Sequence, residues 1–187
     1  DSASRGLGDV YKRQALEGMR LVKENLTVVY DDPANLTGRA HMMSAAMMGA
    51  TAFQKGLGAI HALSHPIGAI YHTHHGTTNA VVMQAVMRFN RSEIEDRFVS
   101  AARYLDIEGG FDGFYDFVGG LVTHLNIPKN LTDLGLQDLG NADFDRIVSA
   151  ALNDPSAGGN PRALTAKNTR APVSYTHLTL PTKDGGG

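Results

Sequence analysis

Five of the chain's eight histidines lie within one short segment, GLGAIHALSHPIGAIYHTHHG at residues 56–76. His61 and His65 are four residues apart, so their side chains would share one face of a helix. Pro66 follows at once and predicts that such a helix weakens there. Imidazole binds divalent first-row metals well, and it is the side chain best suited to proton transfer near neutral pH. The segment therefore indicates a metal site or acid–base catalysis.

The histidine spacing has a second explanation, in which these side chains are hydrogen-bonded members of a helical core. A catalytic metal site needs about three protein ligands and one open position. No carboxylate stands beside the histidines, since Glu17, Asp31 and Asp32 belong to an upstream element. The chain also has no cysteine, so any metal must be held by nitrogen and oxygen. Spacing alone leaves both explanations open.

The two ends of the chain share an unusual relationship. Residues 9–14 can be encoded by a DNA element whose reverse complement, in a shifted frame, encodes residues 173–178. A transposase-based sequencing library leaves such inverted copies around an insert. We therefore expect residues 1–14 and 172–187 to be foreign, adapter-derived sequence that does not belong to the native fold. Residues 15–171 are then expected to be the native part, the size of one ordinary domain.

Composition excludes several classes of partner. The net charge is −2 with neutral histidines, which provides no basic surface for nucleic acid or for an anionic membrane. No apolar run is long enough to span a bilayer. We therefore expect neither a nucleic-acid partner nor a membrane partner.

Apolar residues recur at helical spacing in most of residues 15–171, and no series of alternating strands is present. Helices are predicted at 15–26, 36–53, 79–90, 91–105, 111–125 and 141–154. Another helix carries His61, and His75 stands where the next one should begin. Ser92 and Glu95 are spaced like a capping box, which predicts a helix start at Ser92. The fold class predicted is all-α, a bundle of about seven helices.

One predicted helix, 36–53, carries a long apolar stripe. Its members are Leu36, Ala40, Met43, Met47, Ala50 and Phe53. Methionine adapts to irregular core gaps, so we expect the methionines of this helix to fill the core rather than to bind a metal. Small residues on the same helix would allow a close approach by a neighbouring helix.

The histidine segment resembles the signature of the iron-containing (group III) alcohol dehydrogenase family. The family pattern G-x-x-H-x-x-x-H-P-x-G, followed after nine or ten residues by H-G-x-x-N-A, fits from Gly58 to Ala80. Residues 37–53 and 153–162 are similar to further family segments, so the resemblance covers essentially all of 15–171. It implies an N-terminal α/β nucleotide-binding domain followed by an all-helical metal domain. Residues 15–171 would correspond to most of the helical domain.

The resemblance assigns roles residue by residue. His61 and His75 match the last two metal ligands of the family. His65 matches the histidine that lies near the nicotinamide and assists proton movement. His74 falls where many members have proline, and His72 matches no family role.

The resemblance also implies what lies outside the chain. The other two ligands, an Asp and a His four residues later, and the glycine-rich cofactor loop would precede Ala15. The parent would be a cytoplasmic, homodimeric enzyme that interconverts alcohols and aldehydes by hydride transfer. It would use Fe(II) or Zn(II), with NAD or NADP bound through the missing domain. The chain alone is expected to be inactive. The alternative is a stand-alone, non-enzymatic helical domain for metal binding or protein interaction.

Overall fold

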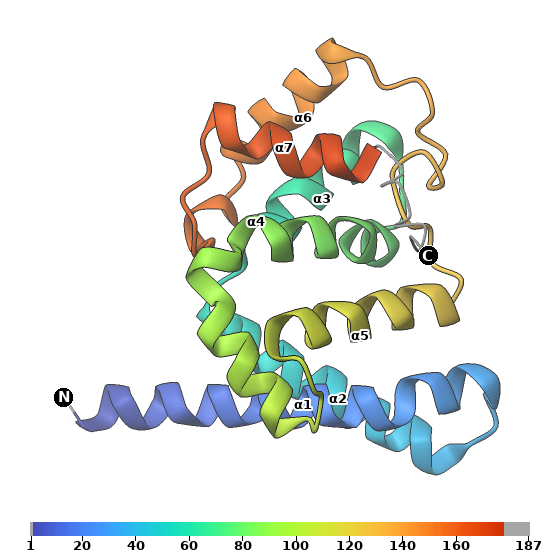
Figure 1. Ribbon diagram of the computed structural model, residues 1–187, viewed down its shortest axis with the longest axis vertical. Helices are drawn as coiled ribbons and strands as arrows, with labels where there is room; N and C mark the ends of the chain where they lie inside the picture. Colours follow the sequence, from blue (N-terminus) through green and yellow to red (C-terminus); the bar gives the residue numbers. More distant parts are fainter. Residues whose placement is uncertain (1, 178–187) are drawn as a thin grey trace, which may run out of the picture. The chain divides into compact units, whose positions relative to one another are not determined.

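The computed structural model describes residues 2–177, which form seven α-helices and no strand (Figure 1). The helices are α1 Ser2–Asp31, α2 Leu36–Ala52, α3 Ala59–Tyr71, α4 His75–Tyr104, α5 Gly110–His124, α6 Asn141–Leu152 and α7 Ala166–His177. Single 3-10 turns lie at Phe53–Lys55 and Ala157–Gly159. The predicted all-α fold is therefore confirmed for this part of the chain. None of its helices combines the length and apolarity that a membrane span requires.

The chain divides into two compact units. Unit 1 contains α1, α2, α5 and the end of α4, from the residues up to Gly56 together with Glu95–Leu125. Unit 2 contains α3, most of α4, α6 and α7, from Leu57–Ile94 and the residues after Leu125. Helix α4 begins in unit 2 and ends in unit 1.

Unit 2 has one continuous apolar core. Helix α6 packs against both α3 and α7, and the start of α4 contributes three valines to the same cluster. The buried members are Ala59, Leu63, Ile67, Val81, Val82, Val86, Leu131, Ile147, Val148, Ala151 and Val173. In α3, α4 and α6 these residues recur at helical spacing, so each of these helices turns one face toward the core, while α7 contributes Val173 and Leu131 lies between α5 and α6.

Unit 1 is built around the contact between α1 and α2. Gly18 of α1 faces α2 closely, since a side-chain carbon there would be in van der Waals contact with Cβ of Met48 at 3.4 Å and the carbonyl of Ala45 at 3.5 Å. Ala45 and Leu21 are buried. A second cluster joins the end of α4 to α5, where the ring of Phe98 lies 5.5 Å from Phe111 and 4.9 Å from Phe114.

The predicted burial of the apolar stripe on α2 is wrong. Leu36 is 79% exposed, Met43 75% and Met47 65%, and Phe53 just after the helix is also exposed. Helix α2 instead buries Gly38 and Ala45, because a close approach to α1 requires small residues at the contact. The large side chains of the stripe therefore lie on a different face of the helix.

Two predicted interruptions of helices are also absent. Pro66 lies inside α3, which continues to Tyr71. A proline inside a helix costs about 3 kcal/mol, but Pro66 is buried, and burial of its ring offsets part of that cost. Ser92 does not begin a helix, since α4 runs without a break from His75 to Tyr104.

The boundary of the native part stays a prediction. Helix α1 includes residues 2–14, and a helical backbone there does not distinguish foreign from native sequence. Of the predicted foreign segment 172–187, residues 178–187 lie outside the described part of the chain.

Candidate functional site

The site is built on α3, whose first turn is held by a residue far away in sequence. Gly58 at the N-cap position has no side chain to accept a backbone hydrogen bond. The Ala59 N–H instead donates to Oδ1 of Asn160 over 3.1 Å. Asn160 is buried and also exchanges two hydrogen bonds with Asn90 of α4, at 2.9 and 2.8 Å. This amide pair fixes the start of α3 relative to α4.

A tight connection then brings the start of α4 beside α3. His72 ends α3 in the left-handed conformation, with φ 56°. The His74 carbonyl accepts from the N–H of Thr78 at 2.9 Å, and Nδ1 of His74 accepts from the N–H of Thr77 at 3.4 Å. His74 therefore caps the first turn of α4. The two histidines without a family role thus have structural ones, in the turn and in the cap.

The three remaining histidines of the segment lie together. The ring centroids of His61 and His65 are 5.6 Å apart, and the ring of His75 lies 5.4 Å from each of them. His61 and His65 come from one face of α3, and His75 is the first residue of α4. The spacing of four residues places His61 and His65 on one face of α3, as the sequence predicted. The position of His75 follows from the start of α4.

Asn79 joins two of the rings. Its Nδ2 group lies 3.0 Å from Nε2 of His75 and 3.5 Å from Nε2 of His61. Both imidazoles therefore direct their Nε2 atoms toward the amide nitrogen of Asn79. Oδ1 of Asn79 is buried and has no hydrogen-bond partner. The sequence indicated no role for Asn79, although its position four residues after His75 places both on one face of α4.

A carboxylate does lie beside the histidines, contrary to the expectation from the sequence. Oδ2 of Asp154 is 2.8 Å from Nδ1 of His65, and the side chain of Asp154 is only 11% exposed. Its other oxygen, Oδ1, accepts from the N–H of Ser156 at 2.8 Å. Burial raises the pKa of Asp154, but the hydrogen bonds from Ser156 and His65 outweigh burial and lower it overall. The separation of 89 residues between His65 and Asp154 hid this pair from sequence analysis.

Electrostatics favour a neutral imidazole at His61. Burial lowers the pKa of His61, and positive charge on His75 or His65 would lower it further. A neutral ring offers a nitrogen lone pair, which is the form that binds a metal.

The donor set fits half of a metal site. The Nε2 atoms of His61 and His75 both face the Asn79 amide nitrogen, and two imidazoles this close suit a divalent first-row ion such as Fe(II) or Zn(II) once that amide turns away. Among residues 2–177, however, no group of three or more His, Cys, Asp or Glu side chains is arranged to hold an ion. Further ligands would have to come from outside the described residues. The roles of His61 and His75 as ligands stay predictions.

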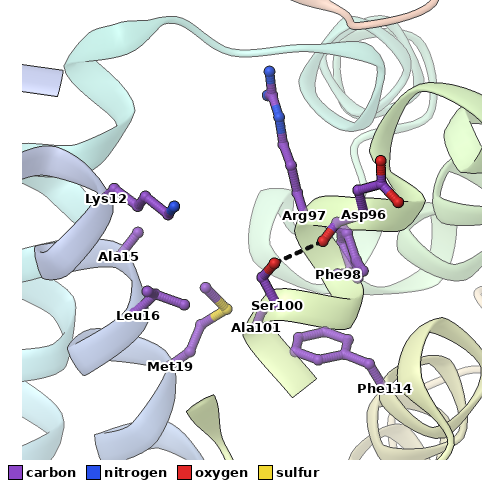
Figure 2. Close-up of a pocket in the computed structure, with 10 residues that line it drawn as sticks. All are labelled: Lys12, Ala15, Leu16, Met19, Asp96, Arg97, Phe98, Ser100, Ala101 and Phe114. Atoms are coloured by element: carbon purple, nitrogen blue, oxygen red, sulfur yellow. Dashed lines mark hydrogen bonds between the residues drawn. The ribbon is translucent and has the colours of Figure 1, made fainter. Parts of the chain in front are cut away.

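Unit 1 contains a separate cavity of about 580 Å³ (Figure 2). Leu16 and Met19 from α1 face Phe98 and Phe114, and the charged side chains of Lys12, Asp96 and Arg97 also line it. The Ser100 hydroxyl donates to the carbonyl of Asp96 at 2.9 Å, a bond within α4. The cavity holds no histidine and no nucleophile with an adjacent base, so the histidine cluster remains the better candidate site.

Comparison with known proteins covers most of the chain. Residues 8–172 match the family model described as "Fe-containing alcohol dehydrogenase family, C-terminal". The chain is 36% identical over 166 residues to 4-hydroxybutyrate dehydrogenase of Cupriavidus necator, covering 83% of this chain and 42% of that protein. It is 30% identical over 169 residues to 1,3-propanediol dehydrogenase of Citrobacter freundii, covering 85% of this chain and 42% of that protein.

Solved structures agree with the sequence matches. The crystal structure of a 1,3-propanediol oxidoreductase superposes with a TM-score of 0.83 at 28% identity, covering 89% of this chain and 45% of that one. The alcohol dehydrogenase from Oenococcus oeni gives a TM-score of 0.81 at 25% identity, covering 88% of this chain and 44% of that one. The chain therefore spans less than half the length of the relatives it matches.

Proposed function

Because the chain belongs to the Fe-containing alcohol dehydrogenase family, we propose that it is the metal-binding, C-terminal part of an NAD(P)-dependent alcohol dehydrogenase. The observation that carries this proposal is the convergence of His61 and His75, whose Nε2 atoms face one point beside the ring of His65. The substrate class is an alcohol or aldehyde, as the names of the relatives indicate. We further propose that the metal is iron or zinc and that the parent enzyme is a homodimer.

In this mechanism each histidine has one task. His61 and His75 would hold the ion through their Nε2 lone pairs. In this structure these lone pairs face the Asn79 amide nitrogen, which would have to turn away when the ion binds. His65 moves the substrate proton at Nε2, since Asp154 engages its Nδ1. When bound, the divalent ion supplies Lewis-acid polarisation of the substrate oxygen. The nicotinamide and the alignment of the hydride depend on sequence beyond this chain.

Metal binding by the chain itself tests the proposal. Cobalt(II) titration, followed by visible absorption and calorimetry, is expected to reveal one weak site per chain. His61→Ala or His75→Ala should weaken this binding at least tenfold, which corresponds to the loss of about 1.4 kcal/mol. His65→Ala should leave the affinity within a factor of about three, or roughly 0.65 kcal/mol.

Matched controls come from the same segment. His72→Ala and His74→Ala remove imidazoles that lie in the turn and the cap, and they should retain the cobalt site. Equal affinity in His61→Ala and the unsubstituted chain would overturn the ligand assignment. The chain alone should not reduce NAD⁺ or NADP⁺ with any alcohol, and turnover by the purified chain would contradict its assignment as a part of the enzyme.

The native part is proposed to be residues 15–171. The inverted relationship between the codons for 9–14 and 173–178 supports this boundary. Sequencing the source DNA across both junctions tests it. A reading frame that continues upstream of Ala15 into Asp-x-x-x-His and a glycine-rich loop is expected. A genome that encodes residues 6–14 directly before Ala15 would refute the boundary.

A further inference from the structure

One short segment after α6 touches α3 at two separate points. At one end of the segment, Asp154 bonds to His65 in the middle of α3. At the other end, Asn160 accepts from the first N–H of α3. Between them, Gly159 lies so close to Leu57 that a side-chain carbon at Gly159 would stand 2.0 Å from the Leu57 carbonyl oxygen. The segment is thus fitted closely to α3, and Asp154 has a fixed position relative to His65.

Both oxygens of the Asp154 carboxylate have assigned partners. Oδ1 accepts from the Ser156 N–H, within the same turn, and Oδ2 faces Nδ1 of His65, each at 2.8 Å. The Ser156 bond prevents the carboxylate from rotating freely. The side chain of His65 is 41% exposed, and its ring also lies beside the rings of His61 and His75, with centroids 5.6 and 5.4 Å away. These rings limit the angle of the imidazole, and the carboxylate of Asp154 bonds to its Nδ1.

An ionised carboxylate can only accept hydrogen bonds, so Nδ1 of His65 must carry the hydrogen. In the neutral ring, Nε2 is then left with a lone pair, and this is the nitrogen that can take a proton from a substrate hydroxyl. The opposite tautomer would place a hydrogen on Nε2 and an unprotonated Nδ1 against a negative oxygen, which is unfavourable.

We propose that Asp154 is a positioning residue that holds His65 in the Nδ1–H tautomer, with Nε2 free to exchange a proton. The catalytic consequence rests on the proposed function, but the tautomer is a property of this chain alone. Asp154 itself touches neither substrate nor ion in this scheme. It acts through the ring of His65.

Nitrogen-15 NMR of the 187-residue chain tests the proposal directly. Long-range ¹H–¹⁵N spectra, recorded without metal at a pH where the imidazoles are neutral, distinguish protonated from unprotonated ring nitrogens. His65→Gln identifies the His65 signals by their loss. The expected spectrum of the unsubstituted chain has Nδ1 of His65 in the protonated range and Nε2 in the unprotonated range. A His65 ring found mainly as Nε2–H would overturn the proposal without any further variant.

Asp154→Asn provides the sharper comparison. The Ser156 N–H needs an acceptor, so it should retain the amide oxygen and turn the NH₂ group toward His65. A donor at that position favours an unprotonated Nδ1, and the tautomer ratio of His65 should invert. Asp143→Asn is the matched control, because Asp143 accepts from Tyr71 and from the Gly140 N–H in the same unit but does not contact His65.

The outcomes separate this proposal from the functional one. An inverted ratio in Asp154→Asn with an unchanged ratio in Asp143→Asn supports the positioning role, even if cobalt fails to bind. An unchanged ratio in a folded Asp154→Asn chain contradicts it, whatever the cobalt titration gives. If Asp154→Asn does not fold, as judged by circular dichroism, the spectrum of the unsubstituted chain still decides.

Discussion

Similar apolar patterns are buried in unit 2 but exposed on α2 of unit 1. In unit 2, apolar residues at helical spacing are buried in one cluster, with Leu63, Ile67 and Ile147 almost inaccessible. On α2 an equally regular stripe, with Met43 and Met47, is exposed. The difference teaches that a helical period identifies an apolar face but not what covers it. Exposed stripes of this kind mark surfaces that meet other parts of a protein.

The comparison also bears on where the site lies. His61, His65, His75 and Asp154 all belong to unit 2. The three histidines lie on helices packed on its apolar core, and Asp154 lies in the segment that follows α6. A site on rigid, well-packed elements keeps its groups in place more accurately than one on loops. The candidate site therefore lies in the unit that has a continuous apolar core.

The largest expected effect contrasts the two regions directly. Ile147→Ala should lower the free energy of unfolding by about 2–5 kcal/mol, because it leaves a cavity in the core of unit 2. Met43→Ala should change that free energy by no more than about 0.5 kcal/mol, because Met43 contacts little in this chain. Urea unfolding followed by circular dichroism measures both. Similar losses in the two variants would mean that α2 is covered in solution, for example by self-association.

A neighbouring pair of glycines should give a smaller but cleaner contrast. Gly159→Ala is expected to cost about 1–3 kcal/mol, because its new methyl group would collide with the Leu57 carbonyl. Gly158→Ala meets nothing within 4 Å and should be neutral or stabilising by up to about 1 kcal/mol. Thermal unfolding of both variants decides. Equal melting temperatures would show that the fit between this segment and Leu57 is looser than the structure indicates.

The smallest effect concerns acid stability in unit 1. Hydrogen bonds from Arg20 lower the pKa of Glu17 to about 2, with Tyr104 adding a weaker contribution and burial opposing both. Since the pKa in the folded chain lies below that of an unfolded glutamate, about 4.3, Glu17 stabilises the fold above that pH. This contribution is lost as the pH falls toward 2.

Glu17→Gln should therefore flatten the pH dependence of stability between about pH 4 and pH 2, without affecting its dependence near neutrality. Urea midpoints measured across this range provide the test. Arg20→Gln should flatten the same range in part, because Tyr104 still donates to Glu17, and the double variant should flatten it no more than Glu17→Gln does. Additive effects would mean that the two side chains are not paired in solution.

Much of the fold was accessible from the sequence because its signals are local. Helical spacing predicted the all-α class, and the step from His61 to His65 placed both on one face of α3. The start of α4 at His75 was also predicted. These inferences need only the helical period and the chemistry of helix ends.

What the sequence did not reveal depends on contacts between distant residues. Asp154 lies 89 positions from His65, and the Gly-rich and Pro-rich composition around it indicated only a loop. Burial of Pro66 and the uninterrupted path of α4 past Ser92 are tertiary effects that outweigh local propensity. The α2 stripe is exposed because α2 contacts α1 through small residues. The sequence did not predict this, since the larger apolar side chains of the stripe indicated a different buried face.

The hydrogen bond from Ala59 to Asn160 has a consequence for how the chain acquires its structure during synthesis. The two residues are 101 positions apart, so the first turn of α3 gains its cap only after the ribosome has added about a hundred further residues. Until then α3 lacks both Asn160 at its start and Asp154 at its centre. Contacts of such long range require a large loop to close, and they slow folding. The histidine cluster is therefore expected to become ordered late, after residues 154–160 have left the ribosome.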